Sequence, residues 1–469
     1  MTGSRRTRTL VIAVPLTGRP VTPIVRTPKG RTAMTDSRIA RLHGRRVWDS
    51  RGRPTVEVEA RLADGAIGRA IAPAGASTGR GEALDLRDGG SRFGGLDVRR
   101  AVDSVNHEIA PALLNRDAAD QEAVDRLLVD LDGTPDRSRL GGNALVATSM
   151  AVLHATAASA GVPLWQHLAG GRPVRIPLPE IQIFGGGAHA DRRVDVQDFM
   201  VMCPAARSFS EALDWTAEIY RAAGTLMRQA GKAQGVADEG GFWPAFDSNE
   251  EALETLTRAI ESAGFVPSAQ VGISLDVAAS QFGSGGRYTL ALDDRTLDTA
   301  ALIDMLGGWI EQYPILSVED PVGEDDHEGM LEFTRRYGHR CQVIGDDYLV
   351  TNAKRVEAAA TGGTANAVLV KPNQAGTVTE AFQALLAGKE AGFGTIVSAR
   401  SGESEDVTIA HLSVGWDAGQ LKVGSFTRSE RMAKWNEVLR IEESLGESAE
   451  FSGWSAFTFA GAGPSTTRR

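Results

Sequence analysis

The sequence runs VGISLD at residues 271–276, ILSVED at 315–320, QVIGDD at 342–347 and AVLVK at 367–371. Each run is a short apolar segment that ends on an ionisable residue. TIVSARS (395–401) then ends at Arg400 and Ser401, and LKVG (421–424) carries Lys422. Helical segments separate the runs, and this alternation predicts a parallel sheet that is either doubly wound or closed into a barrel. Because a barrel gathers the carboxyl ends of its strands at one mouth, the aligned ionisable residues favour an α/β barrel.

Three of these strand ends carry carboxylates, namely Asp276, Glu319 and Asp346. Unpaired carboxylates that meet at a barrel mouth would repel one another strongly. A divalent cation removes that conflict, and ligands that are all oxygen favour magnesium over zinc. We therefore predict a Mg²⁺ site, in preference to the alternative that these residues form salt bridges to surrounding helices.

Two further runs contain lysines: AVLVK ends at Lys371, and LKVG carries Lys422. A lysine among apolar neighbours and near other cations has a lowered pKa and serves as a general base. We predict that Lys371 is such a base and Lys422 the nearby cation, although either lysine alone would fit a solvated rim residue. GASTG (75–79) is a candidate lid loop, and DEGG (238–241) sets a carboxylate on a glycine-rich segment.

The first part of the chain has a different pattern. TVEVEARL (55–62) alternates as a half-buried strand, and residues 66–72 predict a second strand after the Asp64-Gly65 turn. Residues 98–160 are helical and rich in alanine. We expect a disordered extension over 1–36, an α+β capping domain over 37–172, a β/α barrel over 173–448 and a flexible tail over 449–469. Ser248 to Glu251 fits a capping box at the start of one barrel helix.

Composition excludes several classes of function. The net charge of −10 disfavours a nucleic-acid partner, and the chain has no apolar run that approaches a membrane span. Two cysteines, Cys203 and Cys341, form no disulfide framework, which favours a reducing cytoplasm. The basic first 33 residues leave open a targeting peptide or a start at Met34 as alternatives to a disordered extension.

The same residues lie in motifs that resemble those of the enolase family. These motifs are DSRGRPT (49–55), GASTG (75–79), DEGGF (238–242), LDVAAS (275–280), SVEDP (317–321), GDD (345–347), Lys371 with Asn373-Gln374, RSGE (400–403) and RSER (428–431). They occur in order from about Ser37 to Gly446. The resemblance implies an α+β cap, an eight-stranded α/β barrel with an irregular start, and reversible dehydration of 2-phosphoglycerate to phosphoenolpyruvate. Enolase-superfamily sites are themselves a standard example of a lysine base that works with magnesium.

The resemblance also implies a role for each site residue. Metal binding would fall to Asp276, Glu319 and Asp346, with Ser77 holding a second Mg²⁺ when its loop closes. Catalysis would fall to Lys371 as base, Glu239 as acid and Asp198 beside it. Substrate binding would fall to Arg400 and Ser401 at the phosphate, Lys422 at the carboxylate, and His189 and Gln197 along the pocket. The expected partner is a small phosphorylated or phosphonate carboxylic acid, and the family is usually dimeric or octameric.

Some positions depart from the family pattern. Asp198 stands where the family has glutamate, and Ala399 where it has histidine, both near the end of the substrate from which the hydroxyl leaves. Further departures are Gln182, Phe184, Gly185, Trp243 and Pro372. Three hypotheses follow: a glycolytic enolase with neutral changes, a specialised paralog such as a carboxyphosphonoenolpyruvate synthase of phosphonate antibiotic biosynthesis, and a non-catalytic binding protein with the enolase fold.

Overall fold

A computed structural model describes residues 25–26, 32–33, 36–459 and 463. The chain divides into two compact units, Met1–Thr35 and Asp36–Arg469. In the first unit, β1 (Val25–Arg26) pairs antiparallel with β2 (Thr32–Ala33). The remainder of the extension predicted over 1–36 lies outside the described residues, apart from Asp36. The second unit contains the cap and the barrel.

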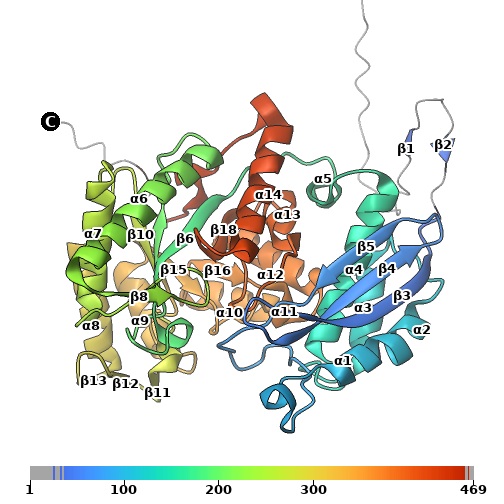
Figure 1. Cartoon of the computed structure of the whole chain (residues 1–469), viewed down its shortest axis with the longest axis horizontal. Helices are drawn as coiled ribbons and strands as arrows, with labels where there is room; N and C mark the ends of the chain where they lie inside the picture. The colour runs from blue at the N-terminus through green and yellow to red at the C-terminus, as the bar shows by residue number, and fades with distance from the viewer. Residues whose placement is uncertain (1–24, 27–31, 34–35, 460–462, 464–469) are drawn as a thin grey trace, which may run out of the picture. The chain divides into compact units, whose positions relative to one another are not determined.

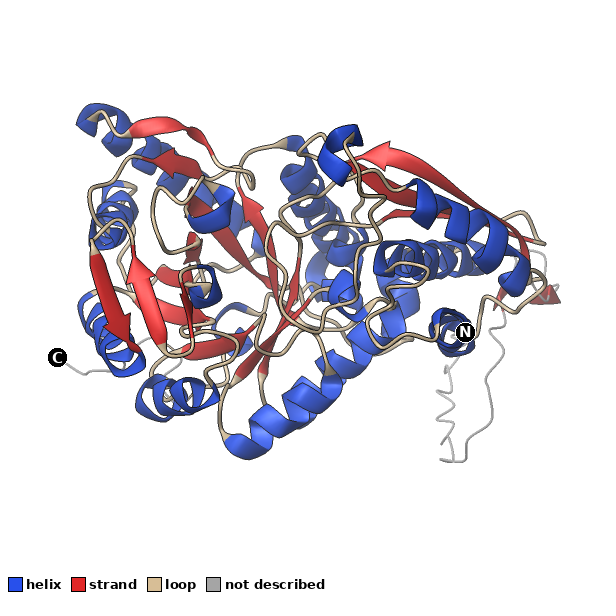
Figure 2. Cartoon of the chain, turned by 90° about the horizontal axis from the view of Figure 1, so that it is seen from below, coloured by secondary structure: helices blue, strands red, loops and turns tan. Residues whose placement is uncertain are grey.

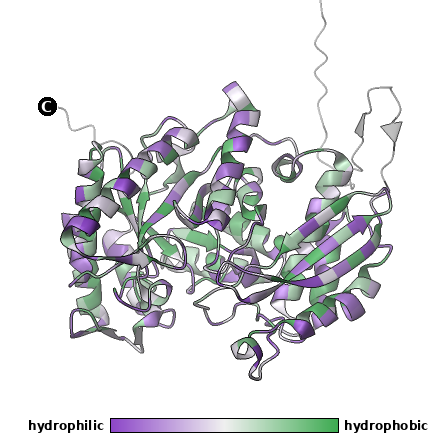
Figure 3. Cartoon of the chain, viewed as in Figure 1, coloured by the Kyte–Doolittle hydropathy of each residue, from purple (hydrophilic) through white to green (hydrophobic). Residues whose placement is uncertain are grey.

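The cap is a three-stranded antiparallel sheet covered by helices (Figure 1). Its strands are β3 (Ile39–Trp48), β4 (Pro54–Leu62) and β5 (Ile67–Ile71). Hydrophilic and hydrophobic residues alternate along these strands, as Figure 3 shows, because one face packs on helices. The predicted β4–β5 hairpin is present, and β3 is an additional strand that the sequence did not indicate to us.

One long helix, α4 (Gly142–Ala160), packs against β4 and β5. The approach is close at Gly68, where a Cβ atom would lie 2.2 Å from the carbonyl oxygen of Ala151. Only glycine fits this contact between strand and helix. The other helical segments of the cap are η1 (Arg92–Gly95), α1 (Arg99–Ser104), η2 (Val105–Ile109), α2 (Ala110–Leu113), α3 (Gln121–Asp132) and α5 (Leu164–Ala169).

Eight strands close into the barrel. In order around it they are β6 (Leu178–Gly185), β7 (Asp198–Met202), β10 (Gly272–Asp276), β14 (Ile315–Glu319), β15 (Gln342–Gly345), β16 (Ala367–Val370), β17 (Gly394–Ser398) and β18 (Gly419–Ser425). Pairing of β18 with β6 completes the ring. The predicted barrel is thus confirmed, but the sheet is not wholly parallel, because β7 runs antiparallel to both β6 and β10.

Helices surround the barrel strands, as Figure 2 shows. They are α6 (Phe209–Ala230), α7 (Asn249–Ser262), α8 (Thr299–Gln312), α9 (His327–Tyr337), α10 (Ala353–Gly362), α11 (Pro372–Ala375), α12 (Val378–Glu390), α13 (Thr408–Gly415) and α14 (Ser429–Leu445). At the start of α7 the Ser248 hydroxyl accepts the Glu251 N–H at 3.1 Å, as the capping box predicted. The Glu251 carboxylate instead accepts the Asp247 N–H at 2.8 Å.

Smaller elements complete the unit. Strands β8 (Ala233–Val236) and β9 (Phe242–Pro244) pair beside β6, and β11 (Gly283–Ser284), β12 (Arg287–Leu290) and β13 (Arg295–Asp298) form a separate sheet. Short 3₁₀ turns are η3 (Gly187–His189), η4 (Ala279–Gln281), η5 (Gly446–Ser448) and η6 (Gly453–Ala456). No helix among the described residues has the length and apolar character needed to cross a membrane.

Part of the segment predicted as a flexible tail packs against the barrel. Phe457 and Phe459 are buried with Leu178 of β6 and Met202 of β7. Burial of two aromatic side chains supplies a hydrophobic driving force that the tail's length and position did not reveal. Beyond residue 459 only Gly463 belongs to the described residues.

Candidate active site

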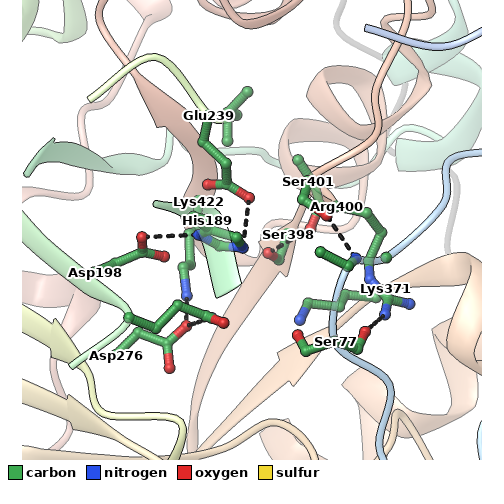
Figure 4. Close-up of a pocket in the computed structure, with 15 residues that line it drawn as sticks. Ser77, His189, Asp198, Glu239, Asp276, Lys371, Ser398, Arg400, Ser401 and Lys422 are labelled. Atoms are coloured by element: carbon green, nitrogen blue, oxygen red, sulfur yellow. Dashed lines mark hydrogen bonds and ion pairs between the residues drawn. The ribbon is translucent and has the colours of Figure 1, made fainter. Parts of the chain in front are cut away.

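A small cavity of about 20 Å³ lies at the carboxyl ends of the barrel strands (Figure 4). Ten of the predicted site residues line it: Ser77, His189, Gln197, Asp198, Glu239, Asp276, Lys371, Arg400, Ser401 and Lys422. The other two, Glu319 and Asp346, are buried beside it and contact the two lysines. The structure therefore brings all twelve residues together, from segments that span more than three hundred positions of sequence.

Lys422 ties two of the predicted metal ligands together. Its Nζ donates to Asp276 Oδ2 at 2.8 Å and to Glu319 Oε2 at 2.7 Å. Burial, and then the nearby Asp276 carboxylate, raises the pKa of Glu319 well above its usual range. Glu319 Oε1 is buried and has no hydrogen-bond partner. A carboxylate oxygen left without a partner in a cluster of oxygen donors fits a site for Mg²⁺.

Lys371 contacts the third ligand. Its Nζ donates to Asp346 Oδ2, and both side chains are about nine-tenths buried. Burial by itself would lower the pKa of Lys371, but the Asp346 carboxylate outweighs it and raises this pKa above its usual value. Our expectation of a lowered pKa was therefore wrong for this arrangement. Apolar neighbours and nearby cations suggested a lowered pKa, whereas the direct ion pair with Asp346 determines the sign of the shift.

Asp346 also belongs to a cluster of three buried aspartates. Ligand atoms of Asp320, Asp346 and Asp347 lie within 4.8 Å of one another. The Asp320 carboxylate accepts the N–H groups of Asp346 at 3.0 Å and Asp347 at 2.8 Å. Asp320 thus fixes the backbone that presents Asp346 to the cavity, a role in which its two oxygens are already satisfied.

His189 bridges the two carboxylates on the opposite wall. Its Nδ1 lies 3.1 Å from Asp198 Oδ1, and its Nε2 lies 3.7 Å from Glu239 Oε1 (Figure 4). Burial would lower the pKa of His189, but Asp198 and then Glu239 outweigh it and raise this pKa to about 9. The imidazole is therefore charged at neutral pH, a consequence that its expected role in lining the pocket did not include.

The loop 75–79 from the cap is fastened to the barrel at the end of β17. Ser401 Oγ accepts the Ala76 N–H at 2.6 Å, and Arg400 Nη2 donates to the Ser77 carbonyl at 2.7 Å. A Cβ atom on Gly75 would lie 2.0 Å from Arg400 Nη2, so the loop touches the guanidinium without spare room. Arg400 and Ser401, which are expected to bind the phosphate, thus contact loop 75–79, which is expected to close over a substrate.

Two residues that support this junction were absent from our predicted site. Arg51 donates to Ser401 Oγ at 3.2 Å and to the Ala74 carbonyl at 2.8 Å. Glu82 accepts from Arg400 Nη1 at 2.8 Å. Arg51 lies in the motif DSRGRPT, which was a signal available in the sequence, whereas nothing in the sequence set Glu82 apart from other acidic residues.

Gln197 and Ala399 fill the remaining wall. Gln197 Nε2 donates to Asp276 Oδ2 at 2.7 Å, and Gln281 donates to Gln197 Oε1. Ala399 lines the cavity with only its methyl group, between Ser398 and Arg400. The wall therefore has no ionisable group at position 399.

Comparisons with known proteins agree with this architecture. The family model "Enolase, N-terminal domain" matches residues 39–168, and "Enolase, C-terminal TIM barrel domain" matches residues 173–460. Enolase 1 of Desulfitobacterium hafniense (strain Y51) is 47% identical to the chain over 431 residues, which cover 91% of this chain and 99% of that protein.

Proposed function

The chain belongs to the enolase family, and from this we propose that it catalyses the reversible dehydration of 2-phosphoglycerate to phosphoenolpyruvate. The observation that carries the proposal is the placement of Lys371 across one cavity from Glu239 and His189 (Figure 4). A base on one side and a proton donor on the other are what removal of an α-proton and departure of a β-hydroxyl require.

Lys371 in its neutral form would take the proton from the carbon beside the substrate carboxylate. Asp346, once it holds Mg²⁺, would raise the pKa of this lysine less, because the cation offsets the carboxylate charge. The electron pair left behind forms the new carbon–carbon double bond as the hydroxyl on the next carbon leaves. Glu239 would deliver a proton to that hydroxyl so that it departs as water. His189, protonated at neutral pH and 3.7 Å from Glu239, is a nearby proton source for it.

Asp276, Glu319 and Asp346 would hold Mg²⁺, and Ser77 would help to hold a second ion. When bound, the cation supplies positive charge that stabilises the negative charge developing on the substrate carboxylate. The unpartnered Glu319 Oε1 supports this assignment. Arg400 and Ser401 would bind the phosphate, and Lys422 and Gln197 would border the carboxylate end.

The direct test is to incubate purified protein and Mg²⁺ with 2-phosphoglycerate and follow phosphoenolpyruvate at 240 nm. We expect turnover that requires Mg²⁺ and is lost in Lys371→Met. Magnesium-dependent binding of substrate without any turnover would contradict the proposed reaction and favour the non-catalytic alternative.

A second candidate is the specialised paralog, and Ala399 is the observation that favours it. Without an imidazole at this position the cavity wall can accept a larger or differently charged group, and Asp198 carries a shorter side chain than the glutamate typical of the family. Phosphorus NMR would compare products from 2-phosphoglycerate alone and with phosphonate co-substrates. Ordinary dehydration by the wild type, unchanged in Ala399→His and with no phosphonate product, would rule this candidate out.

We also propose a homo-oligomer, dimer or octamer, in the cytoplasm. Size-exclusion chromatography with light scattering would measure the oligomeric state, and a monomer at micromolar concentration would contradict it.

A further inference from the structure

Gln182 is a buried amide that contacts both acidic segments of the site. It lies on β6 and has no exposed surface. Its Nε2 donates to Asp198 Oδ1, and its Oε1 accepts the Gly241 N–H at 2.8 Å. One side chain therefore joins the start of β7 to the glycine-rich segment that carries Glu239.

The Glu239 segment is a tight turn whose shape depends on a few contacts. Ala237 N–H donates to the Gly241 carbonyl at 2.7 Å, and Gly240 N–H donates to the Ala237 carbonyl at 3.0 Å. Gly240 has a φ of +96°, which favours glycine. A Cβ atom on Gly241 would lie only 2.4 Å from Gln182 Oε1, so the amide fits directly against the backbone.

With these contacts, Gln182, Asp198, His189 and the segment 239–241 form a closed ring of neighbouring groups. Gln182 joins Asp198 to Gly241, while His189 lies 3.1 Å from Asp198 and 3.7 Å from Glu239. An uncharged amide is suited to this position because it donates to a carboxylate at one end and accepts from a backbone N–H at the other. A carboxylate there would repel Asp198, and an apolar side chain would leave a buried N–H without a partner.

We propose that Gln182 is a positioning residue that sets Asp198 and Glu239 in place on either side of His189. The inference rests on the proposed function and deepens it, because it separates the two halves of the reaction. Lys371 lies across the cavity, where its Nζ donates to Asp346 rather than to Asp198, His189 or Glu239 (Figure 4). Disturbing Gln182 should therefore impair loss of the hydroxyl far more than removal of the α-proton.

Two assays distinguish these steps in the full-length protein with Mg²⁺. Proton abstraction is measured as exchange of the C2 hydrogen of 2-phosphoglycerate with D₂O by NMR, and dehydration as formation of phosphoenolpyruvate at 240 nm. In Gln182→Met both hydrogen bonds are lost at similar volume. We expect kcat for dehydration to fall by about 100-fold, the scale of a displacement of about 1 Å in a catalytic group. Exchange and KM should change by less than about threefold.

Gln182→Glu tests the hydrogen-bond pattern itself. When protonated, the new carboxyl donates to Asp198 and accepts from Gly241 just as the amide does. Dehydration by this variant should therefore recover towards acidic pH, relative to the wild type, and decline as the added carboxyl ionises. A role in packing alone would produce no such pH profile.

Gln342→Met is the matched control. Gln342 is also a buried glutamine, and its Nε2 donates to Ser317 Oγ at 3.2 Å and to Gln420 Oε1 at 3.1 Å, away from the cavity. It should leave the ratio of exchange to dehydration unchanged. The inference fails if Gln182→Met retains wild-type dehydration, if it loses both activities in proportion, or if Gln182→Glu shows no recovery at low pH. A wild type that supports neither exchange nor dehydration would instead overturn the proposed function, and this inference with it.

Discussion

Lys422 is the buried cation on which two of the predicted metal ligands depend. Its ammonium lies 2.8 Å from Asp276 and 2.7 Å from Glu319, whose side chains are 3% and 0% exposed. Methionine in place of Lys422 would leave two carboxylates buried together without a positive charge. Removing one partner of a buried ion pair costs about 3–5 kcal/mol. For a unit of about 430 residues with an unfolding entropy of about 2.1 cal/mol/K per residue, this lowers Tm by about 3–6 °C.

Thermal unfolding in EDTA and in saturating Mg²⁺ provides the assay. Mg²⁺ should raise the Tm of Lys422→Met by several degrees more than that of the wild type, because it supplies the missing positive charge. The control is Lys389→Met: Lys389 donates to the Trp416 carbonyl at 3.0 Å, near the start of β18, and its loss should not alter the response to Mg²⁺. The reasoning is refuted if Lys422→Met melts at the wild-type temperature in EDTA and does not respond to Mg²⁺.

Four further predictions concern the base, two histidines and the loop. Lys371→Met should reduce both hydrogen exchange and dehydration by about 10²–10⁴-fold, the usual contribution of a general base, while calorimetry still detects substrate binding. The pKa of His189 is raised to about 9 from 6.5, so its stabilising contribution is complete below pH 6.5 and is lost as the pH rises through 9. In urea unfolding, the stability difference between wild type and His189→Gln should therefore shrink by about 3 kcal/mol across that window, and a constant difference would contradict the assignment. Burial lowers the pKa of His411 from 6.5 to about 4. The contribution of the neutral imidazole to folding stability is therefore complete above pH 6.5 and is lost as the pH falls to 4. In His411→Gln, the free energy of unfolding should fall less steeply across this range. Gly75→Ala would place a methyl group 2.0 Å from Arg400 Nη2, and we expect the displaced loop to lower kcat by about 100-fold in steady-state assays, whereas wild-type kinetics would show that the loop yields freely.

The sequence predicted the barrel because five of its strands are short apolar runs that end at ionisable residues, and a sixth, β18, carries Lys422 within it. Strand β6 escaped notice because Pro179, Glu180 and Gln182 interrupt its apolar pattern. These polar residues are tolerated only through partners distant in sequence, such as Ser274, whose hydroxyl donates to Glu180 at 2.9 Å. The reversed direction of β7 depends on the loop before it, and no periodicity within a strand encodes its direction.

For the site, sequence identified residue types but not their pairings. The family resemblance assigned roles to Lys371 and His189, yet the sign of each pKa shift comes from contacts with Asp346 and Asp198 that form only in the fold. Glu82 was missed for the same reason, because its role depends on a hydrogen bond from Arg400, which lies more than three hundred positions away in the sequence.

Closure of the barrel by β18 on β6 imposes an order on biosynthesis. The cap sheet and α4 are complete in the growing chain by residue 160, whereas β18 ends at Ser425. At about 5–20 residues per second, roughly 260 intervening residues take about 13–50 s to emerge, and domains generally fold from the N-terminus first. Until residues 400 and 401 are made, the cap loop has no Arg400 or Ser401 to contact. From its synthesis until β18 is complete, β6 presents an edge without its β18 partner that can associate with other chains. Each newly made molecule should therefore acquire activity only after residue 425 has been made, and ribosomes stalled before that residue should release chains with open, aggregation-prone barrels.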